Sequence, residues 1–215
     1  TNKDIDLKGE LTSSFLEAYP GGSVDLTVSV TGGIATNIEY YDGDSLIGNS
    51  AQSPYVITAS NLNVGRNNFY ARVYDGANFN ITNLVTVIVG EQLPYSGTPT
   101  VIPGTFDAAH YDSFEGGVGS GIAYQDMSIV NEGNFRLTEY VDAESSQNEG
   151  DVVGWITPGE WLEYTVDVQQ AGNYTMTFRY ASGNAAGGGP FRLESDGLTV
   201  KSNISVNSTG NWNTW

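Results

Sequence analysis

Residues 149–168, EGDVVGWITPGEWLEYTVDV, carry the clearest fold signal in the chain. The Pro158-Gly159 pair separates two apolar runs, and proline and glycine are the residues that most strongly mark turns. After this turn the side chains alternate, with Leu162, Tyr164, Val166 and Val168 on one face and Trp161, Glu163, Thr165 and Asp167 on the other. A period of two residues is typical of a half-buried strand. We therefore predict β-structure here.

The same alternation recurs elsewhere, and no segment shows a convincing helical period. Candidate strands lie in SVDLTVSV (23–30), NNFYARVYD (67–75), NLVTVIVG (83–90), YTMTFRYASG (174–183) and FRLESDG (191–197). Asp42-Gly43 and Asp75-Gly76 are hairpin signals between apolar runs. Short strands at this spacing favour antiparallel sandwiches. The predicted fold class is all-β, with two β-sandwich domains in tandem, the first immunoglobulin-like and the second a lectin-like jelly-roll sandwich.

Residues 90–104, GEQLPYSGTPTVIPG, interrupt the strand pattern. Prolines and glycines with few apolar anchors indicate a linker. The predicted organisation is a first β-sandwich over 1–92 that acts as a spacer, a linker over 93–103, and a second β-sandwich over 104–215.

Charge excludes several classes of partner. The 215 residues have a net charge of −17. Residues 1–92 contain 4 basic and 10 acidic residues, and residues 93–215 contain 4 basic and 15 acidic residues, so both parts are acidic. Nucleic acid is excluded because no basic stripe exists, and an anionic membrane would repel both parts. A neutral partner or a cation such as Ca²⁺ fits better.

Cysteine is absent, which excludes disulfides, zinc–thiolate sites and a cysteine nucleophile. No apolar run approaches the roughly 18 residues that a membrane-spanning helix needs.

The second part resembles the family 6 carbohydrate-binding modules, β-sandwich units appended to polysaccharide-degrading enzymes. The matching segments are IPGTFDAAHYD (102–112), GIAYQD (121–126), FRLTEYVDAE (135–144), VVGWITPGEWLEYTVDVQQAGNYTMTFRYASG (152–183) and STGNWNTW (208–215). The linker is similar to those that precede such modules in marine bacterial agarases and related enzymes. On the basis of YDGDSLIGNS and SPY, the first part resembles bacterial immunoglobulin-like modules.

The resemblance implies a sugar-binding cleft formed by loops at one end of the sandwich. Two tryptophans, Trp155 and Trp212, are expected to hold a sugar ring between them. Flat aromatic rings cover the apolar C–H faces of a pyranose, while polar side chains bond its rim of hydroxyls. Further candidate ligand contacts are Tyr124, in a predicted loop, and the acidic residues Glu144, Glu149 and Asp151.

The resemblance also implies a structural Ca²⁺ near Asp107. Family members carry Glu-Ala-Glu where this chain has Asp107-Ala108-Ala109, so one carboxylate is shortened and the other is missing. The family continues for two more strands, so we expect the module to be incomplete at its C-terminus. We expect a secreted or cell-surface bacterial monomer, covalently linked to a catalytic domain outside these residues. The expected ligand is an agarose-type galactan or another neutral β-glycan.

Alternatives come from the residues themselves. Large aromatic side chains are usually buried, so each tryptophan is also interpretable as a packed core residue, and loop carboxylates are commonly only solvated. A structural spacer or adhesin is a second functional class. A glycoside hydrolase is a third functional class, since the chain is rich in acidic residues and such an enzyme needs a pair of carboxylates about 5–10 Å apart. Glu160 and Glu163 could supply carboxylates, but they lie on or beside a regular strand. His110, the only histidine, is expected to be a surface residue.

Overall fold

The computed structural model describes residues 6–215, and these contain strands but no helix. The predicted all-β class is therefore confirmed. The strands of the first part are β1 (Lys8–Ser13), β2 (Glu17–Ala18), β3 (Ser23–Thr31), β4 (Asn37–Asp42), β5 (Ser45–Ser50), β6 (Tyr55–Ser60), β7 (Gly65–Asp75), β8 (Asn78–Ile81) and β9 (Val85–Val89). The described residues form no helix long and apolar enough to cross a membrane.

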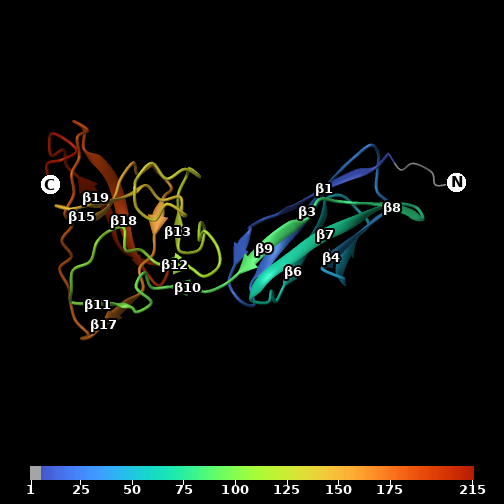
Figure 1. Ribbon diagram of the computed structural model, residues 1–215, viewed down its shortest axis with the longest axis horizontal. Helices are drawn as coiled ribbons and strands as arrows, with labels where there is room; N and C mark the ends of the chain where they lie inside the picture. The colour runs from blue at the N-terminus through green and yellow to red at the C-terminus, as the bar shows by residue number, and fades with distance from the viewer. Residues whose placement is uncertain (1–5) are drawn as a thin grey trace. The chain divides into compact units, whose positions relative to one another are not determined.

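These strands form two sheets that share one apolar core (Figure 1). One sheet has the order β1-β3-β6, and the other has the order β2-β9-β7-β4-β5, with β8 paired to β7. Alternation decides which side chains enter the core: Val24, Leu26 and Val28 of β3 are buried, and Asp25 between them is exposed. The strands predicted over 23–30, 67–75 and 83–90 are confirmed as β3, β7 and β9.

Both predicted hairpins are present. The turn between β4 and β5 contains Gly43 at φ 54°, and the turn between β7 and β8 contains Gly76 at φ 65°. A positive φ is the left-handed conformation that glycine adopts without a steric cost. Glycine at these two positions therefore allows each chain reversal.

The later strands are short and pair mostly in twos. They are β10 (Gln92–Leu93), β11 (Thr100–Ile102), β12 (Ser113–Phe114), β13 (Tyr124–Gln125), β14 (Ala143–Ser146), β15 (Gly150–Val153), β16 (Trp161–Leu162), β17 (Val166–Val168), β18 (Gly188–Ser195) and β19 (Leu198–Val206). The ladders are β10–β12, β11–β17, β13–β16, β14–β15 and β18–β19, and only β11–β17 is parallel.

The strand expected over 161–168 is split into β16 and β17. Between them, the N–H of Glu163 donates to the carbonyl of Ala123 at 3.0 Å, and the N–H of Thr165 donates to Asp112 Oδ1 at 2.9 Å. The backbone thus changes partners in the middle of the run, which ends one ladder before the next begins. Part of the predicted linker is also paired, since β11 lies beside β17.

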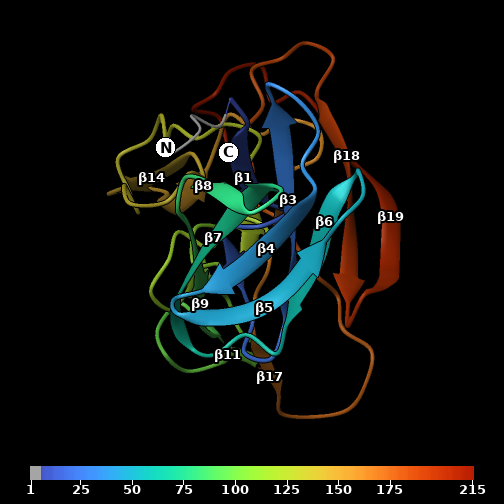
Figure 2. The ribbon, with the colours of Figure 1, turned by 90° about the vertical axis from the view of Figure 1, so that its right-hand side faces the viewer.

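Backbone contacts divide the chain into two compact units, residues 1–170 and 171–215. In the second unit β18 and β19 form a long hairpin (Figure 2), which confirms strand structure over 191–195. The strand expected over 174–183 is absent, and Tyr174, Met176 and Phe178 are exposed. Alternation encodes an extended segment, but a strand also needs a hydrogen-bonding neighbour, and no described strand pairs with this one. The domain boundaries predicted above remain a prediction.

Tyr40 links stability of the first part to pH. Its ring is buried and its hydroxyl donates to the carbonyl of Tyr55 at 2.6 Å. Burial raises the pKa of this hydroxyl from 10.0 to about 12. A raised folded-state pKa stabilises the protein below pH 10 and loses that contribution as the pH rises from 10 towards 12.

We therefore predict that the stability advantage of the wild type over Tyr40→Phe shrinks by about 1 kcal/mol between pH 8 and pH 11. Urea unfolding at the two pH values measures this difference. Leu26→Ala, which removes apolar packing from the same core, is the control, and its stability deficit should be the same at both pH values. An unchanged difference for Tyr40→Phe would contradict the prediction.

Candidate functional site

A buried arginine organises the segment that begins the second part. The Arg136 side chain is only 7% exposed. Its Nη1 donates to the carbonyl oxygens of Ala109 (3.2 Å) and Tyr111, and its Nη2 donates to the carbonyl oxygen of Asp112 (3.0 Å). Nη2 and Nε of Arg136 each lie 2.9 Å from a carboxylate oxygen of Glu139. The charge of Arg136 is therefore neutralised while it fixes the backbone of residues 109–112.

Tyr111 lies directly under this guanidinium, whose carbon is 3.6 Å from the ring centroid. The Tyr111 hydroxyl donates to Glu139 at 2.7 Å. Burial, together with this hydrogen bond to a carboxylate, raises the pKa of Tyr111 well above its ordinary value. The ring stays neutral at physiological pH, as a core residue should.

Tyr124, predicted to contact ligand from a loop, lies in β13 and has no exposed surface. Its ring packs edge-on against Tyr111, with centroids 5.4 Å apart, and its hydroxyl accepts the N–H of Tyr140 at 3.0 Å. The prediction for Tyr124 is therefore wrong: its aromatic ring belongs to the small core that it shares with Ala123 and Val141. A side chain without exposed surface cannot contact a sugar.

Trp155 is exposed, at 56%, just after β15. Its φ is 48°, the left-handed region that costs a non-glycine residue on the order of 1–2 kcal/mol. The preceding Gly154 N–H donates to the carbonyl of Asp142 at 2.8 Å, which anchors the turn. Because the indole is exposed, its burial cannot offset the backbone strain at Trp155. Strained backbone that is held by its surroundings is common in binding sites.

The Pro-Gly turn after Trp155 is fixed by Glu160. Its carboxylate accepts the N–H of Thr157 (2.7 Å), the hydroxyl of Thr157 (2.9 Å) and the N–H of Met127 (3.3 Å). The carboxylate of Glu163 accepts a hydrogen bond from Gln92 at 2.9 Å. Both carboxylates are thus engaged within the chain. Trp161, in β16, is 38% exposed.

The hairpin of β14 and β15 separates the predicted acidic contacts. Glu144 pairs with Val152, and Asp151 pairs with Ser145. Because directly paired residues share a face and successive residues alternate, Glu144 and Asp151 lie on opposite faces of the hairpin. Glu149 lies in the turn and is half-buried. The structure thus does not bring Glu144 and Asp151 together.

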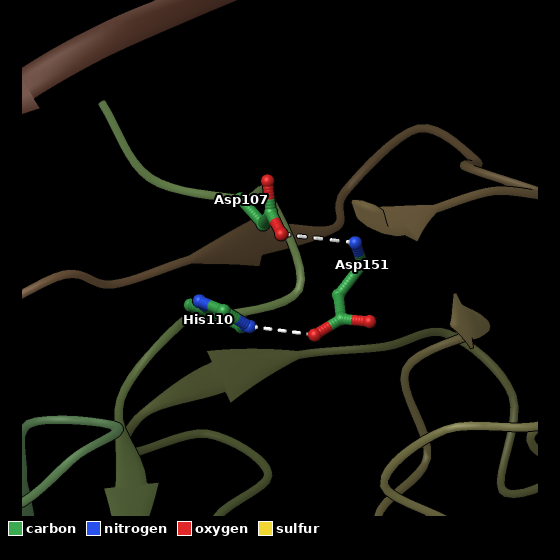
Figure 3. Close-up of side chains that lie close together, drawn as sticks. All are labelled: Asp107, His110 and Asp151. Atoms are coloured by element: carbon green, nitrogen blue, oxygen red, sulfur yellow. Dashed lines mark hydrogen bonds and ion pairs between the residues drawn. The ribbon is translucent and has the colours of Figure 1, made fainter. Parts of the chain in front are cut away.

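Asp151 instead meets Asp107 and His110, whose ligand atoms all lie within 4.8 Å of one another (Figure 3). His110 Nε2 is 2.7 Å from Asp151 Oδ2, and the N–H of Asp151 donates to Asp107 Oδ2 at 3.0 Å. We call these three residues the Asp107–His110–Asp151 cluster. The pKa of Asp151 is lowered, first by a hydrogen bond from Ser145 and then by His110. The cluster can hold a metal ion.

The side chains of this cluster do not fit calcium well. Ca²⁺ takes six to eight oxygen ligands, whereas the cluster supplies two carboxylates and one imidazole nitrogen. Ala109, which stands where a second glutamate would be expected, has a buried methyl group and no side-chain oxygen. The expected calcium ligands are therefore too few among these residues.

Trp212 lies in the second compact unit and is 67% exposed. A methyl group added at Gly183 would come within 2.7 Å of Cε2 and Nε1 of its indole. The ring therefore packs directly on the backbone of Gly183, and only glycine leaves it this position. Neither Trp155 nor Trp212 is a packed core tryptophan.

Comparison with known proteins supports the C-terminal resemblance. The model of the carbohydrate binding module (family 6) matches residues 135–215, a range that includes both Trp155 and Trp212. This match supports a non-catalytic carbohydrate-binding module. No curated protein matches the chain.

Two solved structures show weak likeness. Fibronectin(III)-like modules of Clostridium thermocellum CbhA are 21% identical, with 39% of this chain and 93% of that chain covered and a TM-score of 0.34. A marsupial T cell receptor is 12% identical, with 41% of this chain and 57% of that chain covered and a TM-score of 0.33. TM-scores this low do not establish a shared fold.

Sequence reasoning missed His110 and Arg136. His110 was expected to be a surface residue, but its ring is half-buried and stacks on Tyr95 at 4.1 Å between centroids. Arg136 was missed because, apart from Glu139 three residues later, its partners are backbone carbonyls more than 20 residues away.

We predict that Arg136→Ala destabilises the second part by about 3–5 kcal/mol, because Glu139 is left as an unpaired buried charge. Chemical denaturation monitored by tryptophan fluorescence measures this loss. Arg192→Ala is the matched control: Arg192 pairs with Glu194 at 2.5 Å on the exposed surface, where such a pair contributes about 1 kcal/mol or less. Equal losses for the two variants would contradict the structural role of Arg136.

Proposed function

We propose that this chain binds a neutral polysaccharide without transforming it, and so targets an attached catalytic domain to its substrate. The observation that carries the proposal is Trp155: an indole that is 56% exposed on a strained, left-handed backbone that the flanking hairpin holds in place. An exposed, pre-positioned ring is what sugar stacking requires, because it loses little conformational freedom on binding.

Trp212 supports the proposal as the second aromatic surface. It is also exposed, and its contact with Gly183 fixes where the ring lies within its own unit. We propose that each of the two rings contacts a sugar of the bound glycan, the role that the family 6 resemblance implies for both. Glu144 and Glu149 are the proposed hydrogen-bond acceptors for sugar hydroxyls. Asp151 forms a hydrogen bond with His110.

Charge narrows the class of glycan. At a net charge of −17 the chain repels sulfated or otherwise polyanionic glycans. A neutral polymer, an agarose-type galactan or another β-glycan, is the proposed ligand. We propose a secreted or cell-surface monomer, with residues 1–92 as a spacer, 93–103 as a linker and 104–215 as the binding domain.

A metal near Asp107 would contribute stability rather than chemistry, since a ligand that binds the folded state raises its stability by mass action. Calcium is the ion that the resemblance implies. It needs more oxygen ligands than the Asp107–His110–Asp151 cluster supplies.

The alternatives have less support. A glycoside hydrolase needs one carboxylic acid and a second carboxylate facing its substrate, and Glu160 is instead hydrogen-bonded within its own turn. Release of reducing ends from any glycan by this chain would contradict the binding-only proposal. A spacer or adhesin role would gain support if no neutral oligosaccharide changed the tryptophan fluorescence.

We predict that Trp155→Ala and Trp212→Ala each weaken glycan affinity by about 2 kcal/mol or more, the scale of an aromatic hot spot. Stability should change by less than about 1 kcal/mol, because neither substitution opens a core cavity. Isothermal titration with the neutral oligosaccharide that binds best on a glycan array measures the first quantity, and thermal unfolding measures the second.

Trp161→Ala is the matched control for these variants. Trp161 belongs to a strand and is more buried than Trp155, so we expect its loss to reduce stability more than affinity. A stability loss of roughly 3–5 kcal/mol in Trp155→Ala with no loss of affinity would instead identify Trp155 as a packed core residue.

We predict that Gly183→Ala reduces glycan affinity about fivefold or more, near 1 kcal/mol, because its methyl group would displace the Trp212 indole, which lies 2.7 Å from the added carbon. Titration calorimetry with the same oligosaccharide measures this. Gly172→Ala, where an added methyl group meets nothing within 4 Å, is the control in the same unit. Wild-type affinity in Gly183→Ala would show that the position of Trp212 does not matter for binding.

A further inference from the structure

We propose that the Asp107–His110–Asp151 cluster binds a divalent transition-metal ion of the zinc class, and that it prefers this ion to Ca²⁺. The proposal is independent of sugar binding. It is carried by the convergence of three ligand atoms from two separate segments, by the backbone that holds them, and by the chemistry of the donors.

The geometry brings the three side chains together at one point (Figure 3). Asp107 and His110 lie on one turn, closed by the His110 N–H donating to the carbonyl of Asp107 at 3.0 Å. Asp151 arrives from β15, and the N–H of Ala109 donates to its carbonyl at 3.1 Å. Donor atoms within 4.8 Å of one another are close enough for one ion to draw them together.

Each ligand is held by its surroundings. The His110 ring stacks on Tyr95 with an interplanar angle of 9°, which fixes the imidazole plane while Nε2 faces Asp151. The Asp107 carboxylate lies against the backbone of Gly150: a methyl group there would come within 2.8 Å of both of its oxygens. Gly150 thus leaves the space that this carboxylate occupies.

The donor set selects the class of ion. Imidazole nitrogen suits zinc, copper, nickel and iron, whereas calcium and magnesium prefer oxygen alone. Carboxylate oxygen and imidazole nitrogen are both ligands that zinc accepts, and a water molecule can complete the fourth position of a tetrahedral site. All three side chains are half-buried, so solvent can complete the coordination. Two negative carboxylates also balance the charge of a divalent cation.

The consequence of binding is a cross-link between distant segments. The ion would tie the turn at 107–110 to the first residues of β15, and the strand that carries Asp151 leads directly to Trp155. Metal loading is therefore expected to stabilise the fold of this region without taking part in any reaction.

The experiment titrates Zn²⁺ or Ca²⁺ into the full chain after dialysis against a chelator, with no glycan present. We expect one Zn²⁺ per chain by calorimetry and a rise in melting temperature of about 5 °C or more at a hundredfold excess over Kd. Ca²⁺ at the same concentration should leave the melting temperature unchanged. An equal or larger rise with Ca²⁺ would overturn the proposal.

Two variants locate the site. His110→Phe keeps a ring for stacking on Tyr95 and removes the nitrogen donor; Asp107→Asn keeps an oxygen that accepts the Asp151 N–H and removes the charge. Each should weaken Zn²⁺ binding more than tenfold, and melting in chelator shows that each is folded. Asp167→Asn, an exposed carboxylate of β17, should bind Zn²⁺ like the wild type. Wild-type Zn²⁺ affinity in both cluster variants would mean adventitious binding to other carboxylates and would overturn the proposal.

Discussion

The guanidinium of Arg136 is the constraint on which the backbone of residues 109–112 and the contacts around it depend. A buried cation must be paired and its N–H groups satisfied, or the desolvation penalty is several kcal/mol. Arg136 meets this requirement with the carboxylate of Glu139 and with the backbone carbonyls of Ala109, Tyr111 and Asp112. The short ladders around it supply few cross-strand pairs, so this network does much of what a continuous sheet does elsewhere.

The contacts of Arg136 also help to position the residues of the proposed metal and sugar sites. Fixing residues 109–112 also fixes His110, whose ring stacks on Tyr95 and faces Asp151 in β15. The guanidinium itself lies 5.3 Å from the Tyr95 ring centroid, so one aromatic ring contacts both the guanidinium and the imidazole. The same hairpin continues to Trp155. The exposed indole of Trp155 is thus connected to the buried guanidinium of Arg136 through contacts made by His110, Asp151 and β15.

The first part achieves its stability in a different way. Its strands are long enough for alternation to fill the space between two sheets, and valine, leucine and tyrosine side chains from both sheets form one core. Burial of apolar surface is the dominant favourable term there, and few polar contacts are needed inside. The contrast explains why the first part was predictable from pattern, while the second was predictable mainly from resemblance.

By itself the sequence determined the all-β class, the strands and hairpins of the first part, and the absence of basic surface for nucleic acid. These follow from local rules: a period of two residues, glycine at turns, and the count of charges. It also indicated the exposed tryptophans through resemblance, which the family match over 135–215 supports. Local patterns cannot specify which distant backbone group a side chain will meet, so Arg136 passed unnoticed.

Only the tertiary structure decided which side chains of the second part are buried and which residues they contact. Tyr124 was expected in a loop that contacts the ligand, but it is buried, because Tyr111 and Val141 pack against it. The alternating run 174–183 does not form a strand, since hydrogen bonding needs a partner that sequence alone does not identify. Asp107, His110 and Asp151 are separated by up to 44 residues and meet only when the turn and β15 come together.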